Sequence, residues 1–489
     1  MTQLPPNQLL PIRLAAPKAV HWIVSTLEDA GHETWAVGGA VRDALAGRPS
    51  DDWDFATRAR PNDVQRIFRR TVPIGVEHGT VGVLARDGTL YEVTTFRRDV
   101  RTTGRHAEVA FADHLEEDLA RRDFTINAVA WHPIQEIVHD PFGGRADMER
   151  RILRTVGKPS ERFAEDYLRV LRALRFAGTF RLEIEAETWS ALVAAVEKLG
   201  ILSAERLHEE LQKVLSGEAP PSRALALYVA SGVARFLYPE LDRMVGLPRV
   251  YGPGAGERRG AQEGGGEWFG HTLAVVDRLP AGRPDLRWAA LLRGLGETGP
   301  LPEGDVASAR DELSLLRAAA ILERLKASNA RIREIAEVAA FSSRPLDPGA
   351  GDEELRRWLS RAGRERLRPV LRIWGAVVRA DMARGEGRNT SRAKASRPGE
   401  VIDPRGRARL ARRLRAIAAS GAPLRVEELA FNGRDLIRMG FAPGPHFREV
   451  LRSLLDGVLT DPSRNRSEAL EEEAAEWLEA HGISPRGSG

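Results

Sequence analysis

The spacing of apolar and polar residues differs between two parts of this chain, and it changes near Gly157. Before that point, short apolar runs at 34–37, 81–85 and 90–96 predict strands, and residues 13–30 predict a helix ahead of them. After it, apolar residues recur at helical spacing to the end of the chain. The pattern predicts an α/β part followed by an all-helical part.

The stretch 36–57 (AVGGAVRDALAGRPSDDWDFAT) carries the strongest chemical signal. Gly38 and Gly39 allow a sharp turn after a strand, and Arg42 follows on the next helix, which suits a triphosphate. Asp52 and Asp54 are two residues apart, so on a strand both carboxylates face one side. Either motif alone often arises by chance. Together they indicate paired divalent metal ions and phosphoryl chemistry.

Three further segments add charged candidates to this site. Glu92, on the second strand of a predicted hairpin, is a candidate third carboxylate, with a solvent-facing strand residue as the alternative. Residues 97–108 are polar and unpatterned, which predicts a mobile loop. The segment 121–128 (RRDFTINA) places two arginines, an aspartate and an asparagine before an apolar element, although RRD is also an ordinary solvated helix end.

A helix predicted from 165 onward places Asp166, Arg169 and Arg172 on one face. Its buried side would be formed by Leu168, Leu171 and Leu174. By itself, an aspartate one helical turn from an arginine forms a solvated ion pair of little energetic weight.

Composition narrows the class of protein. The chain has 489 residues, 42% hydrophobic and 29% charged, with a net charge of +4 and no cysteine, so disulfides and thiolate zinc sites are excluded. We find no membrane-spanning run and no signal peptide, and expect a cytoplasmic protein. Residues 251–267 and 385–398 are expected to be flexible. The arginines at 405–415 form a candidate phosphate-binding stripe, with a solvated helix face as the commoner explanation.

Five ordered motifs together resemble the bacterial class II tRNA nucleotidyltransferases. This family comprises the CCA-adding enzymes with their A-adding, CC-adding and poly(A) polymerase relatives. The resemblance covers roughly residues 30–215 and continues more weakly beyond. The motifs read GGAVRD…DDWDFAT, EEDLARRDFTINAVA, DPFGGRADMERRILRTVG, AEDYLRVLRALRFAG and SAERLHEEL.

The resemblance implies a fold and a division of the chain. It implies an α/β nucleotidyltransferase head like that of polymerase β, with a mixed sheet and helices, followed by all-α parts. The expected domains are the catalytic head at 1–155, a neck with the base-recognition helix at 156–218, a degenerate HD-like body at 219–345 and a tRNA-binding tail at 346–489.

The resemblance also implies roles for the candidate residues. Gly39 and Arg42 would hold the incoming triphosphate, and Asp52 and Asp54 would bind Mg²⁺, with Glu92 as the added catalytic candidate. The nucleotide-binding candidates from the later motifs are Arg121 or Arg122, Asp123, Asn127, Asp166, Arg169, Arg172 and Arg175.

Two of these residues could read the base. Cytosine and adenine both present an exocyclic amine next to a ring nitrogen that accepts. Asp166 only accepts and Arg169 only donates, so the pair matches both bases, while guanine and uracil carry the reverse order. A mismatched buried polar group can give roughly 10⁴-fold rejection.

Two departures from the family pattern qualify the expected function. His271 is present, but the position of the His-Asp doublet reads Arg293-Gly294, which predicts a structural histidine and no phosphohydrolase activity. The segment 97–108 lacks the usual tyrosine and the Arg-Arg-Pro run of the loop that helps relatives pass from CTP to ATP.

We therefore expect template-independent CCA addition to tRNA from CTP and ATP, with no membrane and no stable protein partner. The alternatives are an A-adding or CC-adding enzyme that works with a second enzyme, a poly(A) polymerase, and an inactive RNA-binding homologue.

Overall fold

The computed structural model forms two compact units, Met1–Asp242 and Arg243–Gly489. Among the described residues, every named strand belongs to the first unit, and the second unit is helical. All of these strands except β12 (Glu183–Ile184) precede Gly157, as the change of apolar spacing predicts. The boundaries at 155, 218 and 345 stay predictions. The residues described are 9–102, 107–248, 267–298, 306–383 and 404–484.

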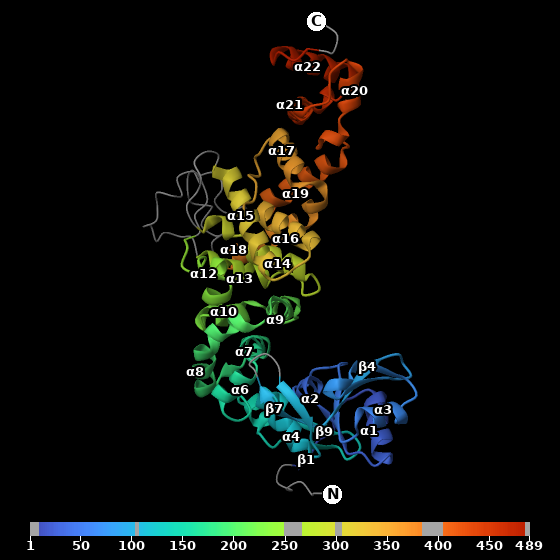
Figure 1. The fold of residues 1–489 in the computed structure, drawn as a ribbon. Coiled ribbons are helices and arrows are strands. Elements are labelled where there is room, and N and C mark those ends of the chain that lie inside the picture. Colours follow the sequence, from blue (N-terminus) through green and yellow to red (C-terminus); the bar gives the residue numbers. More distant parts are fainter. Residues whose placement is uncertain (1–8, 103–106, 249–266, 299–305, 384–403, 485–489) are drawn as a thin grey trace. The chain divides into compact units, whose positions relative to one another are not determined.

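One eight-stranded mixed sheet forms the core of the first unit (Figure 1). Its order is β1-β10-β9-β2-β3-β6-β5-β4; β3 and β6 run parallel, and the other described neighbours run antiparallel. The strands are β1 (Leu9–Pro11), β2 (Thr34–Val37), β3 (Asp54–Thr57), β4 (Thr71–Gly75), β5 (Thr80–Leu84), β6 (Leu90–Thr95), β9 (Ala130–His132) and β10 (Ile137–His139).

Both faces of the central strands are buried, because neighbouring side chains of a strand point to opposite sides. Ala36 of β2 joins one apolar cluster with residues of α1, α2 and α3. Trp35 and Val37 join a second cluster with residues of α4. The helices of this part are α1 (Lys18–Asp29), α2 (Gly39–Leu45), α3 (Pro61–Ile67), α4 (Leu115–Ala120) and α5 (Gly144–Glu149).

The mobile loop predicted at 97–108 is wrong for most of its length. β7 (Arg97–Thr102) and β8 (Ala107–Phe111) pair antiparallel, with an irregular register between Asp99 and Arg101, while 103–106 lie outside the described residues. The Phe111 ring lies against Gly79, where an added Cβ would be 2.8 Å away. These two strands do not alternate regularly between apolar and polar residues, so the sequence pattern did not indicate a hairpin.

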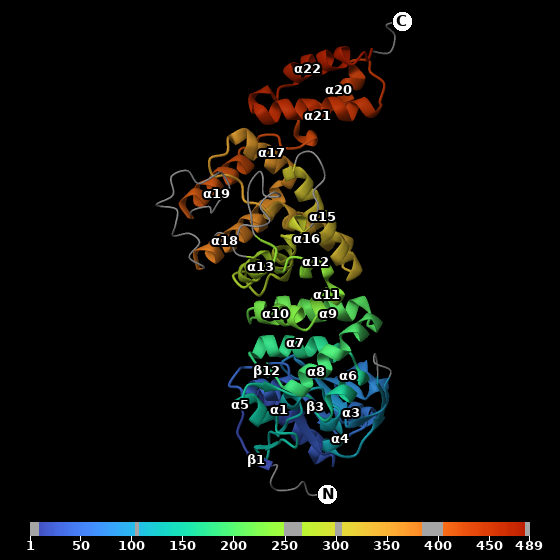
Figure 2. The same cartoon turned by 90° about the vertical axis from the view of Figure 1, so that its left-hand side faces the viewer.

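Helices follow the sheet and complete the first unit. The parallel pair β11 (Ile152–Leu153) and β12 (Glu183–Ile184) ties the start of this part to the end of α7. α7 packs against both α9 and α10 (Figure 2). The helices are α6 (Pro159–Glu165), α7 (Leu168–Phe180), α8 (Ala186–Ala195), α9 (Ala204–Ser216), α10 (Ser222–Ala230), α11 (Val233–Leu237) and α12 (Pro239–Asp242).

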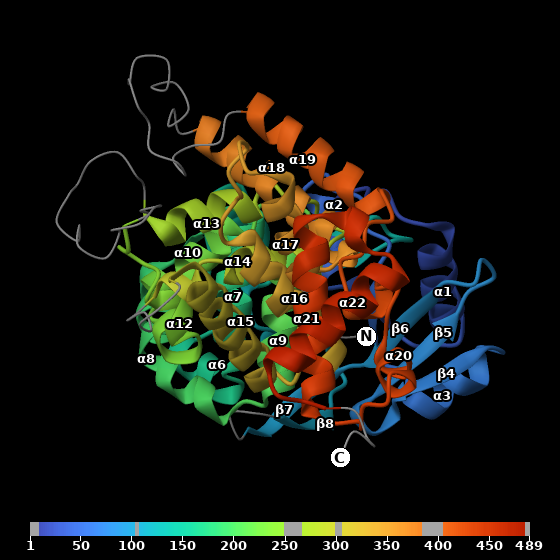
Figure 3. The ribbon, with the colours of Figure 1, turned by 90° about the horizontal axis from the view of Figure 1, so that it is seen from above.

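The second unit contains the predicted helical blocks, and α18 packs beside α19 (Figure 3). The flexible segments predicted at 251–267 and 385–398 lie outside the described residues, apart from Glu267. The helices are α13 (Trp268–Val276), α14 (Pro284–Leu292), α15 (Val306–Arg324), α16 (Asn329–Ser342), α17 (Asp352–Ala362), α18 (Leu367–Ala383), α19 (Pro404–Ala419), α20 (Gly433–Arg438), α21 (Pro445–Thr460) and α22 (Ser467–Ala480).

None of the helices in the described residues is long and apolar enough to cross a membrane.

Gly144 sets how closely α5 approaches the segment after α4. A Cβ there would lie 2.0 Å from the carbonyl oxygen of Thr125. We expect Gly144→Ala to lower the free energy of unfolding of the first unit by about 1–3 kcal/mol or more, because backbone must move. Urea unfolding followed by circular dichroism measures this. Gly75→Ala is the control, since nothing lies within 4 Å of its added Cβ; equal losses in both variants would contradict the explanation.

Candidate active site

The strand register brings Asp54 and Glu92 together on the central strands of the sheet, near the point where β2 ends. Val37, the last residue of β2, pairs with Asp54 of the antiparallel β3. In the parallel pair β3–β6, Phe55 is level with Val93, so Asp54 and Glu92 occupy neighbouring positions on the same face. Glu92 is exposed and faces the same cavity as Asp54, which favours the catalytic interpretation over the solvent-facing one.

A glycine is required where β2 turns into α2. Gly38 has φ 81°, in the left-handed region that other residues rarely adopt. Its missing side chain also makes room: an added Cβ would lie 3.3 Å from Nη1 of Arg122 and 3.6 Å from Oδ2 of Asp54. The turn therefore lets an arginine and a carboxylate approach the backbone at the start of α2.

The predicted pair of aspartates is only partly brought to the cavity: Asp54 lines it, and Asp52 does not. β3 begins at Asp54, and Asp52 lies before it, so the prediction of a strand over both is wrong. Trp53 between them is buried, and its Nε1 donates to the carbonyl of Ser50 at 2.8 Å. Burial, then Asp52 and Glu92, raise the pKa of Asp54 to about 6 despite the nearby Arg122.

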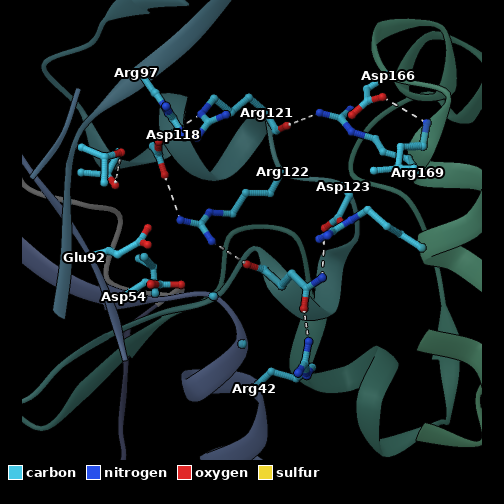
Figure 4. A pocket seen from close by; sticks show the side chains of 18 of the residues that line it. Arg42, Asp54, Glu92, Arg97, Asp118, Arg121, Arg122, Asp123, Asp166 and Arg169 are labelled. Atoms are coloured by element: carbon cyan, nitrogen blue, oxygen red, sulfur yellow. Dashed lines mark hydrogen bonds and ion pairs between the residues drawn. The ribbon is translucent and has the colours of Figure 1, made fainter. Parts of the chain in front are cut away.

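A cavity of about 550 Å³ opens beside these carboxylates, and arginines dominate its wall (Figure 4). Carboxylates and arginines thus line one cavity, which is large enough for a nucleotide. The charged and amide residues that line it are Arg42, Asp54, Glu92, Arg97, Asp118, Arg121, Arg122, Asp123, Asn127, Asp166, Arg169, Arg172 and Arg206, and Gly38 and Gly39 complete the turn.

Asp118 positions both arginines of the RRD motif. Its buried carboxylate accepts from Nε of Arg121 and from Nη2 of Arg122, each at 3.1 Å. Burial alone would raise the pKa of Asp118, but the two guanidinium groups hold it below its usual value. Arg122 also donates to the carbonyl of Asn127 at 3.3 Å. Both arginines line the cavity, and Arg122 is the one beside Gly38.

Asp123 joins α7 to α2 through a chain of hydrogen bonds. Its Oδ2 accepts from Nε of Arg172 at 2.8 Å, and its Oδ1 accepts from Nδ2 of Asn127 at 3.0 Å. The amide oxygen of Asn127 accepts in turn from Nη1 of Arg42 at 2.6 Å. Although burial opposes it, Arg172 and Asn127 lower the pKa of Asp123 to about 2, so this carboxylate stays charged.

Asp166 and Arg169 both reach the cavity, but not as one helical face. α6 ends at Glu165, and Asp166 is extended with its Oδ1 accepting from the N–H of Leu168. The ordinary Asp166–Arg169 ion pair is absent among the described contacts. Instead Asp166 accepts from Nη2 of Arg206 at 2.7 Å, and Arg169 donates to Glu165 at 2.5 Å. Leu168 is half-buried and lines the cavity rather than the core.

Arg175 does not line this cavity. Its Nε donates to the buried Glu210 at 2.7 Å, and its guanidinium lies 4.3 Å from the centre of the Phe176 ring. The contact ties α7 to α9. Its contacts are those of a helix support, and a role for Arg175 in nucleotide binding stays a prediction.

Sequence reasoning missed Asp118, Arg97 and Arg206. Asp118 could have been found, because it lies three and four residues before Arg121 and Arg122, the spacing of neighbours on a helix. Arg206 lies 40 residues from its partner Asp166, and no local pattern connects them.

Comparison of the sequence with known proteins gives matches that together cover most of the chain. Residues 34–154 match the Poly A polymerase head domain, and residues 181–245 match a probable RNA and SrmB-binding site of polymerase A. A CCA-adding enzyme of Geobacillus thermodenitrificans is 33% identical over 452 residues, covering 92% of this chain and 94% of that protein. The chain belongs to the family of CCA-adding enzymes.

Two more relatives support this assignment. A CCA-adding enzyme of Bacillus stearothermophilus, solved in complex with CTP, superposes with a TM-score of 0.64 at 31% identity, over 95% of this chain and 98% of that one. One from Anoxybacillus flavithermus is 47% identical over 221 residues, 45% of this chain and 55% of that protein, so this match spans about half of the relative. The predicted family, fold class and nucleotidyltransferase activity are confirmed.

The position of the missing His-Asp doublet is filled by a buried network. Nη2 of Arg293 donates to Nδ1 of His271 at 2.6 Å, so Nε2 carries the ring proton and donates to Asp381 at 2.9 Å. All three side chains are buried, and both ring nitrogens bind protein groups. This supports the structural role predicted for His271.

The arginines predicted to form a stripe on α19 are not all exposed on one surface. Arg405, Arg409, Arg412 and Arg415 are exposed. Arg407 is only 8% exposed, and burial lowers its pKa to about 9. Arg413 pairs with Asp352 at 2.6 Å. The exposed members remain candidates for contacts with phosphate.

We expect Asp118→Asn to weaken CTP binding by about tenfold, because Arg121 and Arg122 lose the buried charge that orients them. Isothermal titration calorimetry with CTP measures the affinity, and circular dichroism checks that the fold is intact. Glu117→Gln is the control, since Glu117 contacts Arg98 at 3.8 Å and does not line the cavity. An unchanged CTP affinity in Asp118→Asn would remove this residue from the site.

Proposed function

We propose that this chain adds C, C and A to the 3′ end of tRNA, without a nucleic-acid template, from CTP and ATP. The observation that carries the proposal is one cavity that holds the coupled carboxylates Asp54 and Glu92, a surrounding set of arginines, and the pair Asp166 and Arg169. Such a cavity suits transfer of a nucleotide whose base is checked by protein groups. Maturation of tRNA by this route would take place in the cytoplasm.

The carboxylates fit Mg²⁺. Burial, together with the neighbouring Asp52 and Glu92, raises the pKa of Asp54 to about 6, and a divalent cation would relieve the repulsion among these carboxylates. Among the described residues, no group of three side chains is arranged to enclose a metal ion. This agrees with the preference of Mg²⁺ for one or two carboxylates together with substrate phosphates and water. We assign Asp52 and Asp54 as ligands, with Glu92 beside them.

The reaction joins the 3′-oxygen of tRNA to the α-phosphorus of the nucleotide. The bond from that phosphorus to the β-phosphate oxygen breaks, pyrophosphate leaves, and the hydroxyl proton passes to water or to a carboxylate of the site. Bound Mg²⁺ supplies activation of the hydroxyl and stabilisation of the departing phosphates. Arg42 and Arg122, at the two sides of the glycine turn, hold the triphosphate in line.

Asp166 and Arg169 would read the base. Both oxygens of Asp166 already accept one hydrogen bond, yet each keeps a lone pair for the amine of cytosine or adenine. Arg169 donates Nη1 to Glu165 and to the carbonyl of Arg162, and Nη2 to the carbonyl of Arg121. It keeps further N–H groups for a ring nitrogen. The protein contacts therefore fix both side chains before the nucleotide arrives.

Other family activities remain as alternatives. An A-adding or CC-adding enzyme that needs a partner enzyme would use the same residues. A poly(A) polymerase is less favoured, because most of the chain aligns with CCA-adding enzymes. An inactive RNA-binding homologue is opposed by the full set of charged residues around the cavity.

The deciding experiment offers the purified chain three tRNAs that end before CCA, after C and after CC, with labelled CTP or ATP and Mg²⁺. We expect CTP incorporation on the first two and ATP incorporation on the third, read on sequencing gels. ATP addition alone, and only after CC, would assign an A-adding enzyme. CTP addition without ATP addition would assign a CC-adding one.

The double variant Asp52→Ala/Asp54→Ala tests the catalytic carboxylates in the same assay. We expect single-turnover incorporation to fall by at least about 10³-fold, because the metal ligands are lost. Asp87→Ala, in the β5–β6 turn, is the control, since Asp87 does not line the cavity. Unchanged extension by the double variant would refute the assigned metal site.

Asp166→Ala tests base reading. We expect selectivity for CTP over UTP to fall by about 10²-fold or more, because the acceptor that rejects the uracil carbonyl is gone. Single-turnover kcat/KM for each nucleotide gives the ratio. Glu161→Gln is the control, since Glu161 on α6 pairs with the exposed Lys158. Selectivity that stays at the native value would contradict the protein template.

A further inference from the structure

A second, smaller cavity shares Arg42 with the first, and neither Asp54 nor Glu92 lines it. It has a volume of about 240 Å³, room for about eight waters at their liquid volume, which suffices for phosphate or pyrophosphate. Four arginines line it, together with Thr179 and Phe180 at the end of α7 and Leu182 just after it. The arginines are Arg42, Arg48, Arg151 and Arg181.

No carboxylate lines this cavity. Among the described contacts, the side chains of Arg48, Arg151 and Arg181 form no hydrogen bond or ion pair with the protein, and all three residues are exposed. Most arginines around the larger cavity have such a partner. Several guanidinium groups gathered without a counter-ion raise the local potential and attract an anion.

The backbone holds two of these arginines in a conformation that is uncommon for residues other than glycine. Arg151 has φ 58° and Arg181 has φ 55°. The parallel pair β11–β12 links the two turns, since the N–H of Glu183 donates to the carbonyl of Arg151 at 2.7 Å. A cost of order 1 kcal/mol at each turn is carried by packing around it, and such residues cluster at ligand sites.

Phe180 and Arg42 connect this cavity with the nucleotide site. The guanidinium carbons of Arg42 and Arg48 lie 4.3 and 4.9 Å from the centre of the Phe180 ring. Arg42 is 7% exposed and lines both cavities, and its N–H groups are held by Asp43 and Asn127. The protein therefore holds Arg42 in place between the two cavities.

We propose that this cavity binds a phosphate group separately from the nucleotide in the active site. Arg48, Arg151 and Arg181 donate to its oxygens, and the buried side chain of Arg42, which is paired with Asp43, forms one wall. Two sources share this chemistry, a free phosphate or pyrophosphate and a backbone phosphate of RNA. The proposal does not depend on the reaction assigned above, because it concerns binding alone.

Arginine modification by phenylglyoxal in metal-free, phosphate-free buffer, mapped by mass spectrometry, tests the site residue by residue. One arm adds inorganic pyrophosphate and the other adds tRNA. We expect Arg48, Arg151 and Arg181 to be protected in parallel, with rates about tenfold lower at about ten times the midpoint concentration. Arg150 is the control, because it is exposed next to Arg151 and does not line the cavity.

The variant Arg151→Gln completes the test. We expect it to raise the concentration that half-protects Arg48 and Arg181 by about tenfold, as a shared ligand requires, whereas Arg150→Gln leaves it unchanged. Protection by pyrophosphate assigns free anions, and protection by tRNA alone assigns RNA phosphate. Modification rates unaffected by both probes, or Arg150 protected to the same degree, would overturn the proposal. An unchanged midpoint in Arg151→Gln would also overturn it. Because no nucleotide is transferred, failure here is distinct from failure of CCA addition.

Discussion

The buried carboxylate of Asp123 is the contact on which the active site depends. It accepts from Arg172 of α7 with one oxygen and from Asn127 with the other, and Asn127 in turn accepts from Arg42 of α2. One charged group thus fixes cations that belong to two structural elements. Its low pKa, near 2, keeps the charge in place at every physiological pH.

The other carboxylates around the cavity differ in how far nearby arginines balance their charge. Asp118 is surrounded by arginines and has a lowered pKa, whereas Asp54 lies beside other carboxylates and has a raised one. The charge of Asp118 is balanced by arginines of the protein, whereas the carboxylates at Asp54 would gain from the cation proposed above. Asp118 therefore maintains the wall of the cavity, and Asp54 marks the proposed position of a ligand.

The sequence alone predicted most of the charged residues that line the cavity, because the motifs that contain them are short and local. The glycine turn, Asp54 and the RRD motif each lie within a few residues, and hydrophobic periodicity gave the change from α/β to helical structure. Long-range partners escaped, as with Arg206, whose contact with Asp166 depends on how α9 packs. The β7–β8 hairpin escaped for a different reason, because polar strands carry no alternation and are specified by pairing.

The His271–Arg293–Asp381 network in the second unit also constrains how the protein can evolve. Arg293→His, the first step toward a His-Asp doublet at Arg293-Gly294, would remove the guanidinium group that donates to Nδ1 of His271. Breaking a buried charge network in this way costs about 3–5 kcal/mol, a large share of the roughly 5–15 kcal/mol that stabilises a domain. A His-Asp doublet at this position would therefore need several substitutions together, because the first of them breaks the buried network.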